Sequence, residues 1–147
     1  MAYGGGWPVL IAALGPRMVE LGAAEADGLI LNWLTPERAA SSVERVRAAA
    51  PVGASPRTAL YLRLMTADAL HQDAERYDGM ANYHRNFLAQ GLATHDDIVA
   101  RTTLSRDDLG AARARLDEYR ASGLDTICIY PMTFDTEDRR ALDDLTR

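Results

Sequence analysis

The chain of 147 residues contains no lysine and a single cysteine. All 16 basic residues are arginines, which indicates a compositional bias and lowers the weight of any one arginine as a site marker, although arginine is also well suited to bidentate phosphate binding. Because Cys128 is the only cysteine, a disulfide within the chain is excluded. We expect Cys128 to be a structural thiol in a buried strand, and a reducing, cytoplasmic setting.

Basic charge and long apolar runs are also scarce. Acidic residues outnumber basic ones by 21 to 16, which leaves a net charge of −5 and no broad basic surface for a phosphate backbone. No run approaches the roughly 20 apolar residues of a membrane span, and the amino terminus has no signal-peptide pattern. We therefore expect a folded protein with neither nucleic acid nor a membrane as its partner, and the apolar content of 48% fits a folded chain.

The most informative stretch is a strand, helix and strand near the start. Val9 to Ala13 is a short unbroken apolar run, typical of a parallel strand that is covered on both faces. Gly15 and Pro16 interrupt this run and begin a helix, which we expect to end at Asp27 and Gly28. Leu29 to Leu31 is the next strand, and the segment between the two strands has the length of a parallel crossover.

The rest of the chain repeats this alternation. Caps, breakers and periodicity predict the following order: a helix from Pro36 to Ala50, a strand from Thr58 to Met65, a long helical region from Asp68 to Gln90, a short helix beginning at Thr94 or Asp96, a helix introduced by a Ser105–Asp108 capping box and closed at Gly123, a strand from Thr126 to Tyr130, and a helix from Asp135 to Thr146. All four strands are continuous rather than alternating in polarity. We therefore expect them to be parallel and buried on both faces.

Four such strands cannot cover their own edges as an open sheet. A closed barrel needs eight strands and about 250 residues, so the pattern predicts an α/β fold that is half of a TIM-type (β/α)8 barrel. It consists of four parallel βα units, with extra helices between the third and fourth strands. We expect residues 1–147 to form one domain, in which residues 1–6 are a flexible leader.

Candidate site residues follow the strands. The turn at Gly15 precedes a helix amino terminus, whose unpaired amides can receive a phosphate with help from Arg17, although many strand–helix turns contain Gly-Pro without binding anything. Asn32, Trp33 and Met132 follow strands at the edge where parallel barrels keep their active sites, or simply close the core. The spacing of the three histidines predicts no metal site.

An aromatic and thioether stripe in the long helical region has two interpretations. Its members recur at spacings of three and four, namely Tyr77, Met80, Tyr83, His84 and Phe87. Ordinary packing is the favoured interpretation, and a ligand pocket or subunit contact is the alternative.

Two segments of the chain resemble a known family. The stretches Val9 to Met18 and Ala26 to Glu37 resemble the luciferase-like monooxygenase superfamily, particularly its deazaflavin-dependent oxidoreductase branch, and Tyr119 to Met132 resembles the end of the same family. The resemblance implies an eight-stranded barrel that uses FMN or the deazaflavin coenzyme. It implies that Leu14, Gly15, Pro16, Arg17 and Met18 form a cofactor-binding loop, and that Trp33 and Met132 lie in the wall of a substrate pocket. Asn32 is added to this pocket because of its position at a strand end. It assigns no catalytic residue.

The resemblance covers only the second half of such a barrel, strands five to eight. A glycine turn often found in the family is replaced here by Thr102 to Ser105. We therefore weigh three hypotheses. The chain is a half-barrel oxidoreductase completed as a homodimer or by a separate N-terminal half, or a non-catalytic truncated relative that has lost the cofactor and acts as an assembly or partner-binding subunit. In the third hypothesis it is a fragment of a longer enzyme.

Overall fold

The sheet is parallel throughout and contains the four predicted strands. The computed structural model describes residues 6–131 and 135–147. The predicted leader thus lies outside the described residues except for Gly6. The strands are β1 (Leu10–Ala13), β2 (Gly28–Asn32), β3 (Arg57–Met65), β4 (Leu104–Ser105) and β5 (Thr126–Pro131). β1, β2 and β3 are neighbours in this order, and β5 pairs with the edge of β3 that faces away from β2. The short β4 pairs with the last two residues of β3.

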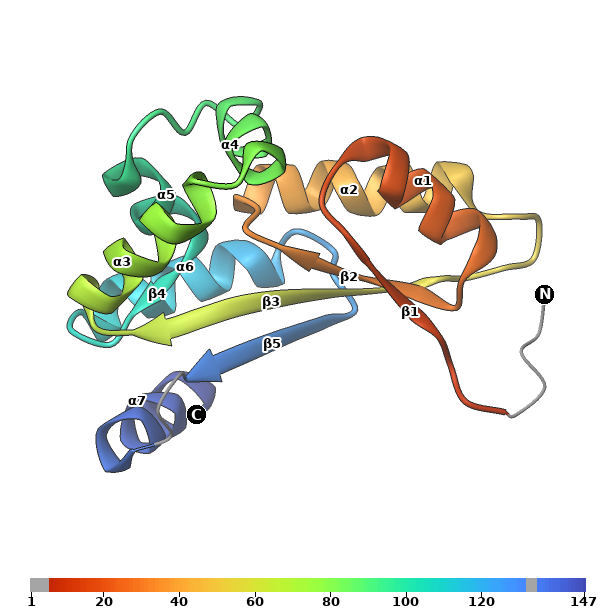
Figure 1. Cartoon of the computed structure of the whole chain (residues 1–147). Coiled ribbons are helices and arrows are strands. Elements are labelled where there is room, and N and C mark those ends of the chain that lie inside the picture. The colour runs from red at the N-terminus through yellow and green to blue at the C-terminus, as the bar shows by residue number, and fades with distance from the viewer. Residues whose placement is uncertain (1–5, 132–134) are drawn as a thin grey trace.

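The helices pack mainly against one face of this sheet and at one of its ends. They are α1 (Pro16–Glu25), α2 (Pro36–Ala49), α3 (Ala67–Asp78), α4 (Ala81–Leu88), α5 (His95–Thr102), α6 (Leu109–Arg120) and α7 (Thr136–Thr146). α1 and α2 lie along one side of the sheet, whereas α3, α4 and α5 gather at the C-terminal ends of the strands (Figure 1). This confirms the expected parallel α/β architecture with added helices between the third and fourth long strands. Within the described ranges, no helix is long and apolar enough to cross a bilayer.

Two local predictions are wrong. The long helical region breaks into α3 and α4 because Gly79, a poor helix former, is followed by Met80 in an extended conformation (φ −97°, ψ 121°). The Ser105–Asp108 capping box does not form, since Ser105 belongs to β4 and Asp108 itself caps α6 by accepting a hydrogen bond from the Ala111 amide. β4 was not predicted because two residues are too few to show a strand pattern.

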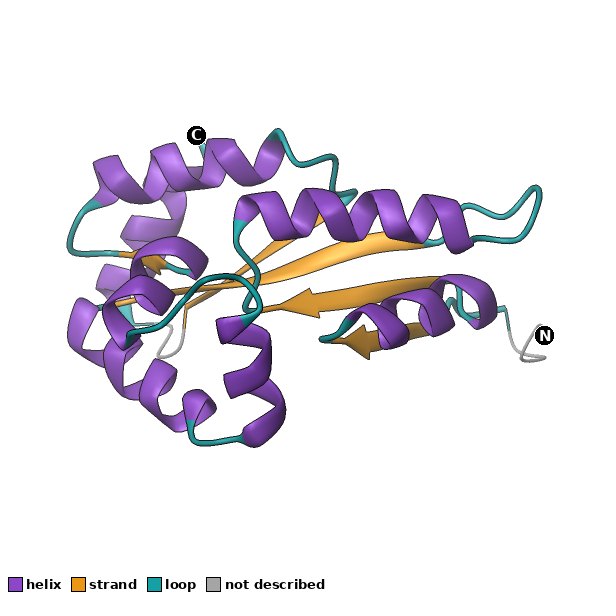
Figure 2. Cartoon of the chain, turned by 90° about the horizontal axis from the view of Figure 1, so that it is seen from above, coloured by secondary structure: helices purple, strands orange, loops and turns teal. Residues whose placement is uncertain are grey.

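The core lies on one face of the sheet. Alternate residues of the strands, among them Leu29, Leu31, Leu60 and Leu62, are buried under α1, α2 and α6. Figure 2 shows α1 and α2 lying over the strands and running along them.

The opposite face of β1, β2 and β5 is open, so the prediction that all four strands are covered on both faces is wrong for these three. Ala12, Ile30 and Cys128 are exposed there, and only β3 is buried on most of both faces. Cys128 is therefore not a buried thiol, because a helix covers only one side of its strand. We call this surface the open face; its exposed members are Leu10, Ala12, Ile30, Thr126 and Cys128.

Gly28 is required by a close approach of two strands. It does not end α1 as expected, since α1 ends at Glu25 and Gly28 is the first residue of β2. A Cβ atom here would lie 2.5 Å from the Arg57 carbonyl oxygen of β3. We expect Gly28→Ala to lower the free energy of unfolding by about 1 to 3 kcal/mol, because one of the two backbones must shift.

Urea unfolding would measure this loss, with Gly15→Ala as the matched control. A Cβ atom at Gly15 meets no atom within 4 Å, and φ there is −107°, which any residue adopts. Equal stability of the two variants would contradict the strand-approach explanation.

Candidate functional site

A cavity of about 580 Å³ lies where the open face meets the C-terminal ends of the strands. β1, β2 and β3 form its floor, and α1, α3 and α4 contribute to its walls. Its lining residues are Ala12, Ala13, Leu14, Met18, Ile30, Asn32, Tyr61, Arg63, Tyr77, Asn82 and Tyr83. This is the edge at which parallel barrels keep their active sites. The cavity is therefore the candidate functional site.

Arg63 is the charged residue of the cavity floor, and it is only 5% exposed. Its Nε donates a hydrogen bond to the Asp73 carboxylate, and its Nη1 donates to Asn32 Oδ1 over 2.8 Å. The guanidinium carbon lies 3.9 Å from the centre of the Trp33 ring and 4.8 Å from that of Tyr77. A buried guanidinium held by a carboxylate, an amide and two aromatic rings has little freedom to move.

The buried carboxylate of Asp73 is shared between two arginines. Besides Arg63 it accepts a hydrogen bond from Arg76, whose side chain is 59% exposed. One negative charge thus faces two positive charges. The cluster retains a net positive charge beside the cavity, which favours a ligand with negative or electron-rich oxygen atoms.

The ring of Trp33 packs against the guanidinium of Arg63, and the backbone of Trp33 has a strained conformation. Its φ of +53° lies in the left-handed region, which is uncommon for a residue other than glycine, and its side chain is 1% exposed. Gln90, just after α4, holds this turn by accepting from the Thr35 amide and donating to the Trp33 carbonyl over 3.0 Å. Residues in such conformations persist where the surroundings fix them, and they cluster at functional sites.

Tyrosines form the aromatic wall of the cavity. The rings of Tyr77 and Tyr83 meet edge to face with centres 4.7 Å apart. Burial, and after it the neighbouring Tyr130, raise the pKa of the Tyr61 hydroxyl above its usual value, so this group is a neutral hydrogen-bonding partner at neutral pH.

The predicted aromatic stripe divides between the two interpretations. Tyr77, Tyr83 and Phe87 pack around Trp33, as expected for a core, and the two tyrosines also line the cavity. Met80 and His84 are exposed and belong to neither arrangement.

The residues of the predicted cofactor loop line two different hollows. Leu14 and Met18 line the cavity, whereas Leu14, Gly15 and Pro16 line a second hollow of only about 20 Å³ together with residues of α2, namely Arg38, Ser41, Ser42 and Arg45. This hollow has room for about one water molecule, so a phosphate here would lie at its mouth. Arg17 is exposed and lines neither hollow.

The predicted substrate-pocket residues do not all line the cavity. Asn32 lines the cavity, while Trp33 lies beneath Arg63 and not in the wall. Met132 lies outside the described residues. Sequence reasoning missed Tyr61, Arg63 and Asp73. The signal for Arg63 was a lone arginine in an apolar strand, whereas nothing local marks Asp73, ten residues away.

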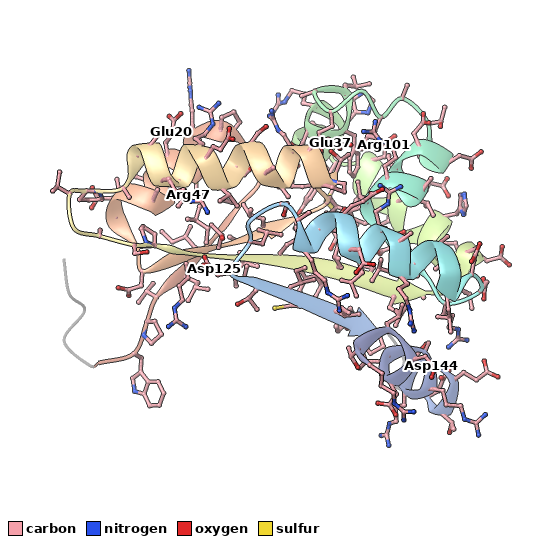
Figure 3. The ribbon with its side chains drawn as sticks, turned by 180° about the vertical axis from the view of Figure 1, so that it is seen from behind. Glu20, Glu37, Arg47, Arg101, Asp125 and Asp144 are labelled. Atoms are coloured by element: carbon pink, nitrogen blue, oxygen red, sulfur yellow. The ribbon has the colours of Figure 1, made fainter. Side chains whose placement is uncertain are left out.

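Hydrogen bonds and an ion pair connect helices at the C-terminal end of the sheet. Asp78 at the end of α3 accepts from His84 over 2.9 Å and from His95 over 3.3 Å, and these hydrogen bonds, led by that of His84, lower the pKa of Asp78. Glu37 of α2 forms an ion pair with Arg101 of α5 over 3.3 Å. Figure 3 labels both residues, which lie beside each other. Among the described residues, no group of histidine, cysteine or carboxylate side chains is arranged to hold a metal ion.

Comparisons with known structures agree with this fold. The chain is similar to an F420-dependent secondary alcohol dehydrogenase in complex with an F420-acetone adduct (14% identity, TM-score 0.60, covering 98% of this chain and 50% of that one). It is also similar to a coenzyme F420 dependent tetrahydromethanopterin reductase from Methanopyrus kandleri (15%, 0.55, 92% and 48%) and to a monooxygenase from Streptomyces bottropensis (18%, 0.50, 95% and 46%). The chain thus spans about half the length of each.

Sequence comparison identifies the family. A search among curated proteins finds no match. The family model described as luciferase-like monooxygenase matches residues 3–126, which is most of the chain. The matched segment includes β1 to β4, α1 to α6 and the cavity between them. The chain therefore belongs to the luciferase-like monooxygenase family.

Proposed function

We propose that this chain is a flavin- or deazaflavin-dependent oxidoreductase, and that its cofactor cleft forms when its open face is covered. The observation that carries the proposal is the cavity at the C-terminal ends of β1, β2 and β3, which combines tyrosines with Asn32 and the buried Arg63. The family membership and the F420-dependent structures of similar fold support it.

The lining residues fit a planar cofactor ring. A cavity of about 580 Å³ falls within the range of ligand sites, roughly 300 to 1,000 Å³. Tyr61 and Tyr77 offer aromatic surface, while Asn32 and Arg63 offer donors for ring oxygens. Leu14 borders both hollows, so a ring in the cavity would bring an attached phosphate towards Gly15 and Arg17. When bound, such a cofactor supplies hydride transfer, and the protein supplies orientation and electrostatics.

Covering the open face requires a partner. In this proposal, either a second copy or a separate N-terminal half supplies the remaining strands and closes a barrel. β1 and β5 form the two edges of the sheet within the described residues, and a closed barrel would pair both. The half-length match to the similar structures is consistent with this arrangement. The proposal includes a reducing, cytoplasmic location.

Cofactor titration tests the proposal. We expect the assembled protein to bind FMN or the deazaflavin coenzyme, and Arg17→Ala to weaken FMN binding about tenfold by removing a charge-assisted phosphate contact. Riboflavin, which lacks the phosphate, should bind both proteins equally. Calorimetric or fluorescence titration measures these affinities.

Arg85→Ala is the matched control, because Arg85 is an exposed arginine on α4 outside both hollows. Failure of the assembled protein to bind either cofactor would refute the enzyme proposal.

The alternative function is that of a non-catalytic assembly or partner-binding subunit. The observation that favours it is the exposed apolar surface of the open face, where Ile30 is 39% and Leu10 36% exposed. It predicts a dimer whose interior is filled by side chains, with a melting temperature that neither cofactor changes.

A further inference from the structure

We propose that Asn32 and Arg63 form a pair of hydrogen-bond donors for an anionic carbonyl oxygen on a planar conjugated ligand. The inference rests on the proposed function, in which that ligand is the pyrimidine edge of a reduced flavin. A carboxylate on an aromatic substrate shares the same chemistry and is the other source of such an oxygen.

The orientation of the Asn32 amide follows from its partner. A guanidinium can only donate hydrogen bonds, so Arg63 Nη1 must meet the amide oxygen of Asn32, at 2.8 Å. The amide nitrogen therefore points away from Arg63, and among the described residues it has no partner. Because Asn32 lines the cavity, this NH₂ group is available to a ligand there.

Arg63 also has N–H donors that make no hydrogen bond within the described residues. A guanidinium has five N–H groups, and the Asp73 and Asn32 contacts use one each at Nε and Nη1. Its Nη2 has no partner in the part of the chain that the structure describes. Among the described residues, Nη2 does not belong to the buried polar atoms that lack a partner, so it is accessible from the cavity that Arg63 lines and can donate to water or to a ligand there.

The charge of the surroundings selects an anion. Asp73 faces both Arg63 and Arg76, so the cluster is positive overall, and the cavity lining contains no carboxylate. Packing of the guanidinium against Trp33 and Tyr77 fixes its position before a ligand arrives. Two fixed donors beside aromatic surface match a flat ring that carries a delocalised negative oxygen better than a flexible or tetrahedral anion.

Three variants test the pair. Asn32→Asp keeps the shape and still accepts from Arg63, but it removes the NH₂ donor and adds a negative charge. Arg63→Gln removes the positive charge and leaves Asp73 paired with Arg76. Arg85→Gln, at an exposed position on α4, is the control for the loss of one positive charge. Circular dichroism and melting temperature show which variants are folded.

Dissociation constants are measured for oxidised FMN, for reduced FMN under anaerobic conditions, and for benzoate. In the wild-type protein we expect reduced FMN to bind more tightly than oxidised FMN. In Asn32→Asp and Arg63→Gln this preference should fall by about 10- to 100-fold, the effect of one lost hydrogen bond to a charged group. The preference should be unchanged in Arg85→Gln. A merely structural role of Asn32 and Arg63 would weaken both redox forms equally.

The outcomes separate the two proposals. Loss of the preference for reduced FMN supports the pair with the ring as its ligand. Benzoate binding that only the two site variants abolish supports the same pair with a substrate carboxylate, and it does so even if FMN does not bind and the proposed function fails. If FMN binds and its redox preference is the same in all proteins, the pair is overturned while the proposed function stands. Absence of binding by FMN, by the deazaflavin coenzyme and by benzoate overturns both.

Discussion

Replacing Asp73 by alanine is expected to lower the free energy of unfolding by about 3 to 5 kcal/mol, because it leaves a buried guanidinium without its carboxylate. The side chains of Arg63 and Asp73 are each 6% exposed, and Arg63 Nε donates directly to the carboxylate. At this degree of burial, water compensates for the lost partner less well than it would at the surface. Urea unfolding followed by circular dichroism measures the change.

Two comparisons make this prediction specific. Glu20→Ala breaks the Arg45–Glu20 ion pair, whose side chains are 46% and 48% exposed, and should cost less than about 1 kcal/mol. The double variant Arg63→Met with Asp73→Ala removes both charges and should regain much of the stability that Asp73→Ala loses. An Asp73→Ala protein as stable as Glu20→Ala would show that the ion pair does not hold α3 against β3.

Replacing Ile30 by arginine is expected to weaken assembly by more than about 100-fold, because association would bury a charge without a partner at a cost of several kcal/mol. Ile30 lies on the open face of β2 and is 39% exposed in the single chain. Cys128 lies on the same face of β5 and is the only cysteine of the protein. Its thiol therefore reports whether that face is covered.

Sedimentation equilibrium and the rate of Cys128 modification by a thiol reagent measure this effect. If a second copy covers the open face, the wild-type chain is a dimer with a protected thiol, and Ile30→Arg is a monomer with a reactive one. If a separate N-terminal half covers it, protection begins only when that half is added. Val52→Arg is the matched control, because Val52 is fully exposed in the loop between α2 and β3.

A compact, stable wild-type monomer whose thiol stays reactive in the presence of an N-terminal half would contradict the assembly proposal.

Much of the fold follows from local signals in the sequence. Thr35 caps α2 by accepting a hydrogen bond from the Arg38 amide. The predicted start of this helix at Pro36 is confirmed. Pro16 begins α1 in the same way. The four apolar runs correspond to β1, β2, β3 and β5 within about one residue at each end. Such signals act over a few residues, so they can be recognised before the fold is known.

The candidate site was predictable only in part. Asn32 lines the cavity, because the C-terminal end of a parallel strand is where such a cavity forms. Arg17, the predicted phosphate ligand, lines neither hollow. The FMN titration with Arg17→Ala tests whether it contacts the phosphate. The central Arg63 was visible in the sequence only as a charge that had to face outward or pair. Its partner Asp73 lies on a different element, and no periodicity links the two.

The sequence by itself determined the order of strands and helices, the parallel sheet and the family, since caps, breakers and apolar runs encode these locally. Only the tertiary structure decided which face of the sheet is covered and which is open. An apolar run shows that a strand avoids water, but it does not show whether a helix of the same chain or another surface covers each side. For the same reason Cys128, in a strand of buried type, is exposed. The Arg63 cluster likewise exists only because β2, β3 and α3 converge at one end of the sheet.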